Sequence, residues 1–279
     1  MREVQAAAIT DAVRRMCISA NCVLPEDVRR RIAACRARED WPPAGEILGR
    51  MVENYETAEK QGIPICQDTG AACVFVELGQ DVHIQGDLNE AIHEGVRRGY
   101  REGYLRKSIV GDPINRVNTR DNTPTIIYYD ITPGQILKIT VAPKGFGSEN
   151  MSRIAMLNPS DGLDGVKSFV VNTVEAAGPN PCPPVVVGVG IGGTFDKAAL
   201  LAKKALLRPT DDTHPEPFYA ALEEELTKKI NALGIGPQGF GGRTTALAVK
   251  IIAMATHIAG LPVAVNLNCH VARHVSEEL

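Results

Sequence analysis

The first 60 residues carry apolar side chains at the 3.6-residue period of amphipathic helices. Val4–Met16 has charged side chains at helical spacing, and Pro25–Arg36 opens with Pro-Glu-Asp, a typical helix start. Ala44–Lys60 keeps the same period after two prolines. The pattern therefore predicts a helical N-terminal segment over about residues 1–60.

Beyond residue 60, short strands and longer helices follow one another without a regular rhythm. Runs rich in β-branched and aromatic residues predict strands, and an apolar run without alternation is typical of a strand buried on both faces. The predicted strands are Ala71–Leu78, Thr125–Asp130, Gln135–Val141, Val185–Val189 and Val263–Leu267. The predicted helices are Asp87–Glu102, Asn150–Leu157, Gly162–Ala177, Phe195–Arg208, Pro217–Leu233 and Thr244–Ala259. This order favours an α+β or irregular α/β fold, with the helical N-terminal region packed on a small mixed or antiparallel sheet in one domain over residues 1–279.

The composition excludes several classes of protein. The chain is 44% hydrophobic and 23% charged, and its formal net charge of −3 gives no electrostatic attraction to nucleic acid. No stretch is apolar enough to span a bilayer, and the N-terminus lacks the apolar core of a secretory signal. We therefore expect a cytoplasmic protein without a nucleic-acid or membrane partner, whose seven cysteines are reduced thiols, metal ligands or small buried side chains.

Three cysteines lie in rigid loops that border strands or helices. Cys66 belongs to IPICQDTG, Cys182 to GPNPCPP and Cys269 to NLNCHVARH. Their wide separation excludes a local zinc knuckle but allows three thiolates to converge on a [4Fe–4S] cluster with one open iron, a Lewis acid for a substrate oxygen. The alternative is that each thiol is simply a small buried side chain. The cysteines predicted to be structural are Cys17, Cys22, Cys35 and Cys73.

Gly188–Gly193 (GVGIGG) matches the spacing of a dinucleotide-binding fingerprint and lies between a predicted strand and helix. The following helix leads into a polar loop, so the acidic residue that would bind a ribose has no place. Glycines at this spacing also permit a close backbone approach or an anion contact at a helix N-terminus. A nucleotide-binding oxidoreductase is therefore a less favoured alternative.

Taken together, several loops resemble the alpha part of class I fumarate hydratases and the related L(+)-tartrate dehydratases. The stretches that carry the resemblance are IPICQDTG, KGFGSEN, AGPNPCPP, GVGIGGTFDKAA, GIGPQGFGGRTTALAV and THIAGLPVAVNLNCH. They run from about residue 60 to residue 274, in one order, which is more specific than any single motif. The resemblance implies that Cys66, Cys182 and Cys269 ligate a [4Fe–4S] cluster whose fourth iron is open.

The resemblance also implies roles for other residues. Asp68 and His257 are expected to belong to the proton-transfer machinery, although a histidine at the end of a predicted helix is more often structural. The residues expected to contact the substrate are Gln67, Arg106 and either Gly145 or Gly147. An arginine at a predicted helix end, such as Arg106, is on position alone more typical of a solvated cap partner.

The chain offers no motif for the group that takes a proton from carbon, or for a cation that binds the second carboxylate. In the resembling family these groups sit on a beta part of swivelling α/β type, for which NLNCHVARH, close to Leu279, leaves no room. We therefore expect a separate beta subunit, a site completed between chains and a symmetric oligomer. The expected reaction interconverts malate and fumarate, with L(+)-tartrate dehydration as the alternative for this small-dicarboxylate enzyme.

Overall fold

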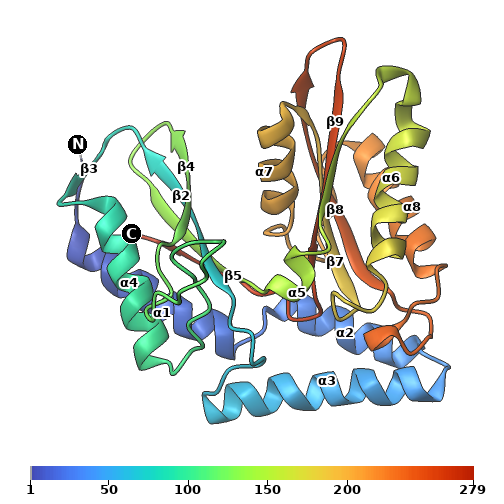
Figure 1. The fold of residues 1–279 in the computed structure, drawn as a ribbon, viewed down its shortest axis with the longest axis horizontal. Coiled ribbons are helices and arrows are strands. Elements are labelled where there is room, and N and C mark those ends of the chain that lie inside the picture. The colour runs from blue at the N-terminus through green and yellow to red at the C-terminus, as the bar shows by residue number, and fades with distance from the viewer. Residues whose placement is uncertain (1) are drawn as a thin grey trace. The chain divides into compact units, whose positions relative to one another are not determined.

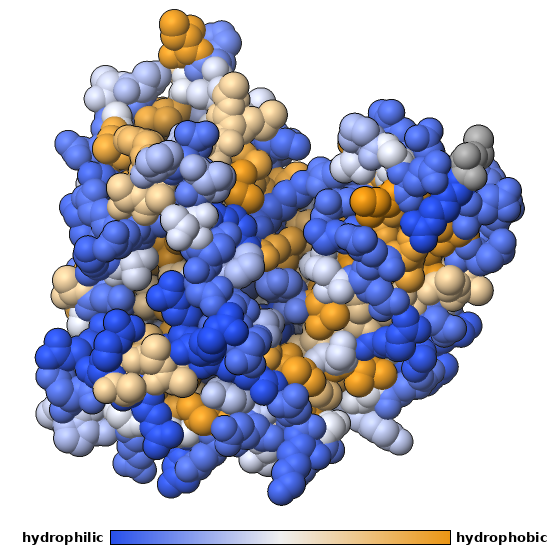
Figure 2. Space-filling view, turned by 180° about the vertical axis from the view of Figure 1, so that it is seen from behind, coloured by the Kyte–Doolittle hydropathy of each residue, from blue (hydrophilic) through white to orange (hydrophobic). Residues whose placement is uncertain are grey.

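The computed structural model describes residues 2–279, which form two compact units (Figure 1). Unit 1 contains the segment up to Pro25 together with Tyr55–Phe146 and Arg273–Leu279, and unit 2 contains Glu26–Asn54 and Gly147–Ala272. The expected α+β class is confirmed, because helices accompany small, mostly mixed sheets. Within residues 2–279, no helix is long and apolar enough to cross a membrane. Hydrophilic residues cover most of the face seen in Figure 2.

Unit 1 is built on a four-stranded sheet in the order β10-β5-β2-β4. The central strand β2 pairs parallel with β4 and antiparallel with β5, and β10 pairs antiparallel with β5. The bounds are β2 (Ala71–Gly79), β4 (Ile126–Thr132), β5 (Leu137–Lys144) and β10 (Val275–Glu278). A separate parallel pair joins β1 (Arg2–Gln5) to β3 (Val82–Gln85). The predicted strands around residues 125 and 135 are thus present, but β2 lies between them.

Two helices, α1 (Ala6–Cys22) and α4 (Leu88–Glu102), pack on each other and form the core of unit 1 with this sheet. The side chain of Asp87 accepts a hydrogen bond from the backbone of Glu90 and caps α4, as the predicted helix start required. A Cβ atom at Gly99 would lie 2.7 Å from the Cβ of Cys17, so glycine is needed where the two helices cross.

Unit 2 is built on a four-stranded sheet in the order β6-β9-β7-β8. Helix α7 packs on one face of the sheet, while α6 and α8 pack on the other (Figure 1). The strands are β6 (Arg153–Leu157), β7 (Val185–Gly193), β8 (Ala246–Thr256) and β9 (Leu261–Asn268). The main helices are α6 (Gly162–Ala177), α7 (Phe195–Ala205) and α8 (Pro217–Asn231). The remaining helices are α2 (Glu26–Arg38), α3 (Pro42–Gln61), which begins in unit 2 and ends in unit 1, and the short α5 (Phe146–Glu149).

Two predicted helices are wrong. Residues of the predicted helix Asn150–Leu157 form the antiparallel strand β6, and most of the predicted helix Thr244–Ala259 forms β8. The first six residues of β8, Ala246–Ile251, are buried without interruption. An unbroken apolar run of this kind has no period that distinguishes a helix from a buried strand.

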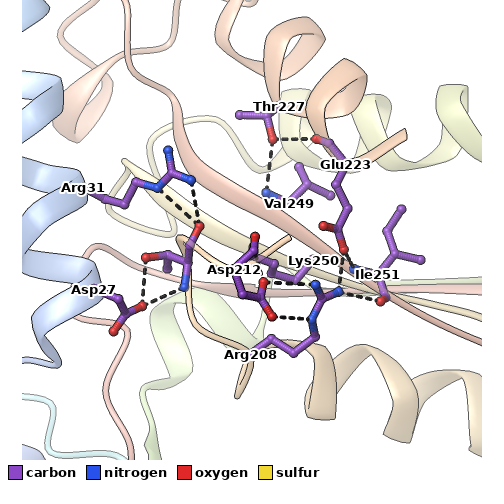
Figure 3. Close-up of polar contacts among 10 residues, drawn as sticks. Asp27, Arg31, Arg208, Asp212, Glu223, Thr227, Val249, Lys250 and Ile251 are labelled. Atoms are coloured by element: carbon purple, nitrogen blue, oxygen red, sulfur yellow. Dashed lines mark hydrogen bonds and ion pairs between the residues drawn. The ribbon is translucent and has the colours of Figure 1, made fainter. Parts of the chain in front are cut away.

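Side chains from α8 bind the outer edge of β8 (Figure 3). Glu223 and Thr227 accept hydrogen bonds from the backbone N–H groups of Ile251 and Val249, at 2.7 and 3.2 Å. Asn231 accepts from the N–H of Ala246 at 2.8 Å. Four residues of a helix rise about 6 Å, close to the length of two strand residues. Polar side chains at every fourth position of α8 therefore reach backbone N–H groups at successive points along β8. This arrangement protects an edge that would otherwise be open to strand pairing.

Candidate active site

The loop Cys66–Gly70 of unit 1 connects α3 to β2, and backbone N–H groups hold the carboxylate of its Asp68 at both oxygen atoms. The backbone N–H of Gly70 donates to Asp68 Oδ1 at 3.0 Å, and the N–H of Phe146 donates to Oδ2 at 2.9 Å. Gly70 has φ +76°, and a Cβ atom there would lie 2.7 Å from the backbone of Lys144. Only glycine fits this position, and the resulting turn fixes the direction of the Asp68 side chain.

Buried polar side chains form hydrogen bonds with the carbonyl groups of this loop. The hydroxyl of Tyr100 on α4 lies 2.9 Å from the carbonyl oxygen atoms of both Thr69 and Gly70, and Asn122 Nδ2 donates to the Gly70 carbonyl at 3.2 Å. Burial raises the pKa of Tyr100 well above its usual value, so its hydroxyl stays protonated and acts as the donor. These contacts restrict the loop main chain, because a buried carbonyl without a donor is costly.

Unit 1 brings together four of the residues predicted from the sequence. Cys66 Sγ lies 3.5 Å from Oε1 of the neighbouring Gln67, and a Cβ atom at Gly145 would lie 3.3 Å from Asp68 Oδ2. Cys66 and Asp68 are half-buried, whereas Gln67 is exposed. Of the two glycines that the resemblance left open, Gly145 is therefore the one next to Asp68 in this unit.

Arg106 lies in the same unit but is not the helix-end residue that the sequence predicted. Helix α4 ends at Glu102, and Arg106 is an exposed residue of the following loop. Its carbonyl oxygen accepts a hydrogen bond from Thr69 Oγ1 at 3.1 Å. The backbone of Arg106 is thus tied to the loop of Asp68, while its side chain is exposed to solvent.

Unit 2 places Cys182 and Cys269 at one end of its sheet. Cys182 precedes β7 and Cys269 follows β9, and the antiparallel pairing sets Val186 opposite Asn268. His270 links the two loops, because its backbone N–H and Nδ1 lie 3.4 and 3.1 Å from the Cys182 carbonyl oxygen. Cys182 is exposed and Cys269 is half-buried, so both are accessible to a ligand.

His257 lies at the other end of the same sheet. It is an exposed residue of the turn between β8 and β9, next to Thr256, which pairs with the last residue of β7. The nine residues of β7 separate the two ends by roughly 26 Å at about 3.3 Å per residue. Unit 2 therefore does not bring His257 to Cys182 or Cys269.

The seven cysteines fall into two groups by exposure: Cys66, Cys182 and Cys269 are exposed or half-buried, and the other four are buried. No disulfide forms among the seven, and the four predicted to be structural are buried. Burial raises the pKa of Cys17 to about 12, which keeps it a thiol, whereas a cluster ligand must be a thiolate. Cys66, Cys182 and Cys269 are not buried in this way, and their accessibility suits ligands of a cluster. Within residues 2–279, no group of three or more His, Cys, Asp or Glu side chains could hold a single metal ion, so the convergence of the three cysteines stays a prediction.

Residues 10–278 match the profile of fumarate hydratase (Fumerase). The chain belongs to the fumarate hydratase family. A protein of Methanocaldococcus jannaschii, provisionally named L(+)-tartrate dehydratase subunit alpha, is 41% identical over 97% of this chain and 97% of its own length. The L(+)-tartrate dehydratase subunit alpha of Escherichia coli strain K12 is 33% identical over 94% of this chain and 87% of its own.

In this member of the fumarate hydratase family, the glycine-rich segment Gly188–Gly193 is not a phosphate-binding turn. Gly188 and Gly190 lie inside β7, where a Cβ atom would be 2.2 Å from the carbonyl oxygen of Ala202 or 2.1 Å from that of Ala198. Both contacts are to the backbone of α7. The glycines therefore allow the helix to pack directly on the strand, which is the alternative that the sequence left open.

A cavity of about 840 Å³ in unit 2 lies between α2, α8 and β8. None of the predicted site residues lines it. Its buried Lys250 pairs with Asp212 at 2.6 Å, and Arg208 pairs with both Asp212 and Glu223 (Figure 3). These charges satisfy one another next to the edge of β8, which indicates a structural network.

The residues that sequence reasoning missed bind backbone atoms. Tyr100 and Asn122 hold the carbonyl groups of the loop, and Arg273 Nη2 donates to the carbonyl oxygen of Asp68 at 2.5 Å. Arg273 could have been noticed because it lies only four positions after Cys269. For the other two, the sequence holds no local signal.

Proposed function

We propose that this chain is the alpha subunit of an iron–sulfur hydro-lyase that interconverts malate and fumarate by removing and adding water. Membership of the fumarate hydratase family supports the reaction class. The observation that carries the proposal is the Asp68 carboxylate, fixed at both oxygen atoms two positions after the accessible Cys66. A carboxylate held in one direction beside a predicted metal ligand suits proton transfer to a departing hydroxyl group.

In this proposal the three cysteines bind the cofactor and Asp68 transfers the proton. Cys66, Cys182 and Cys269 would hold a [4Fe–4S] cluster, which supplies, when bound, one iron without a protein ligand as a Lewis acid. Asp68 gives a proton to the leaving hydroxyl, or takes one back, at one of its two carboxylate oxygen atoms. Each oxygen accepts one backbone hydrogen bond and keeps a second lone pair for this proton.

The other predicted residues bind the substrate. The exposed guanidinium of Arg106 is free to clamp one carboxylate as a planar fork, and the Gln67 amide reaches polar groups beside it. Gly145 lets the substrate approach the backbone next to Asp68, because it carries no side chain there. The second carboxylate and the proton on carbon are left to a beta subunit, since the relatives are named as alpha subunits.

His257 requires a second copy of the chain if it works with Asp68. A cluster that binds Cys182 and Cys269 lies at the end of the sheet opposite His257 of the same copy. We therefore assign His257 to the site of a neighbouring copy in a symmetric oligomer. Random mixing of inactive Asp68→Asn and His257→Asn copies into dimers should restore about one quarter of the sites. No recovery on mixing would contradict the exchange of His257 between copies.

L(+)-tartrate dehydration is the second candidate, because the relatives described above carry that name. Both substrates should be tested with the chain purified and reconstituted anaerobically, alone and with its beta subunit. We expect fumarate to form from malate only in the two-subunit enzyme, with slower release of water from tartrate. Faster turnover of tartrate would favour the second candidate, and no turnover of either by the iron-loaded complex would refute the proposal.

A further inference from the structure

Arg273 is a buried arginine beside the loop of Asp68. It is only 4% exposed, and its Nη2 donates to the carbonyl oxygen of Asp68. Its Nε and Nη1 are buried as well, and neither has a hydrogen-bond partner among residues 2–279. Burying a guanidinium with one of its three nitrogens bonded opposes folding. The stability of unit 1 therefore does not explain why an arginine occupies this position.

Two buried groups that sense the charge of Arg273, the thiol of Cys22 and the phenol of Tyr100, are neutral. Burial raises the pKa of the Cys22 thiol, and the positive charge of Arg273 opposes that rise only in part. Burial also raises the pKa of Tyr100 far above its usual value. A thiol and a phenol that keep their protons do not compensate the charge of Arg273. The loop that Arg273 contacts carries the anions: the Asp68 carboxylate and, when it acts as a ligand, the Cys66 thiolate.

We propose that Arg273 is a positioning residue for the hydro-lyase reaction, which holds the main chain of Asp68 so that the carboxylate keeps its direction. The inference rests on the proposed function, in which Asp68 transfers the proton. Two backbone N–H groups hold the side chain of Asp68, and Arg273 supplies the third anchor, at its carbonyl. Without this anchor, the peptide group after Asp68 can rotate and the carboxylate loses its alignment with the leaving hydroxyl.

The kinetic test compares Arg273→Met and Arg273→Lys in the iron-loaded two-subunit enzyme. We expect the methionine variant to lose about 10- to 100-fold in kcat, the range for one hydrogen bond to a charged group, with KM within about threefold. Lysine keeps the charge and one donor and should recover part of the loss. A matched control is Arg31→Met, because Arg31 also donates to a backbone carbonyl, that of Thr210 in unit 2. We expect this control to keep its kcat.

A second measurement does not depend on turnover. Amide hydrogen exchange at Gly70 and Phe146, the two donors to the Asp68 carboxylate, should become about tenfold faster in Arg273→Met than in Arg31→Met. Equal exchange in the two variants would overturn the positioning role, even in an enzyme that turns over malate. An unchanged kcat in Arg273→Met, with the wild-type enzyme active, would overturn it as well. An inactive wild-type complex would instead refute the proposed function, and the exchange rates would still decide whether Arg273 holds the loop.

Discussion

Replacing Gly190 with alanine tests the close packing of α7 on β7. The new Cβ atom would lie 2.1 Å from the carbonyl oxygen of Ala198 and 2.6 Å from the nitrogen of Ala202. Ordinary contacts begin near 3.4 Å, so α7 would have to withdraw by roughly 1.3 Å. Both obstacles are backbone atoms, which cannot rotate away as a side chain can.

The expected cost follows from what this movement disturbs. Overpacking a core typically costs about 1–3 kcal/mol, and α7 also presents the buried residues Ala198 and Ala202 to the sheet. The conformational gain from replacing a glycine, about 0.5–1 kcal/mol, offsets only part of this cost. With a cost near the upper end of that range, we expect Gly190→Ala to lower the free energy of unfolding by about 2 kcal/mol.

The same chemical change at Gly45 provides a control of opposite sign. Gly45 lies in α3, and a Cβ atom there would meet no heavy atom within 4 Å. Alanine should therefore stabilise this helix by about 0.5–1 kcal/mol. Urea unfolding followed by circular dichroism under reducing conditions would measure both changes. Equal stability of Gly190→Ala and the wild type, or a shift in the same direction as Gly45→Ala, would refute the close-packing argument.

Three further changes test the site and the charge network. Cys182→Ser should lose bound iron and sulfide after anaerobic reconstitution, whereas Cys35→Ser, in the core, should keep both; equal iron contents would remove Cys182 from the ligand set. Asp68→Asn should keep its iron but slow turnover at least about 100-fold, and an active variant would exclude proton transfer by Asp68. Burial raises the pKa of Asp212, but Lys250 and Arg208 outweigh it and lower the pKa overall. The carboxylate therefore stabilises the fold above about pH 4 and loses this effect as the pH falls through its lowered pKa, so acid titration of the unfolding free energy should be flatter in Asp212→Asn.

The sequence predicted most helices correctly but could not identify β8 as a strand. Helices such as α1 and α4 can be recognised in the sequence by their polar face and, for α4, by the capping residue Asp87. The partners of the β8 backbone lie elsewhere in the chain: one edge of β8 pairs with β7, and polar side chains of α8 bind the other edge. The hydrophobic pattern of β8 alone therefore cannot predict that it forms a strand, because these partners come from other parts of the chain.

The sequence allowed us to propose candidate residues only where a side chain has distinctive chemistry. A thiol in a proline-rich loop, as at Cys182, or a carboxylate next to a thiol, as at Asp68, can be noticed in the sequence. Tyr100 and Arg273 act on backbone carbonyl groups, which every residue possesses. Their role therefore depends on the folded path of the chain and leaves no mark on the loop sequence itself.

The GVGIGG segment shows why spacing alone was ambiguous. A helix that packs directly on a strand and a pyrophosphate that approaches a backbone both require residues without a Cβ atom. The two cases differ in where the glycines fall. Here Gly188 and Gly190 lie within the paired part of β7, opposite β9, and not in a turn after it. The structure of unit 2 thus accounts for the motif by helix packing, without a nucleotide.

Both units gather their candidate chemistry by the same rule of strand pairing. In unit 1, β2 begins directly after the loop of Asp68, and its antiparallel neighbour β5 ends just before Gly145, so Ala71 faces Lys144. In unit 2, β7 begins after Cys182 and its antiparallel neighbour β9 ends before Cys269. The start of a central strand always lies beside the end of an antiparallel neighbour. Residues far apart in the sequence are therefore brought to one end of each sheet, whereas His257, which follows Thr256 at the end of β8, lies at the opposite end of the sheet of unit 2.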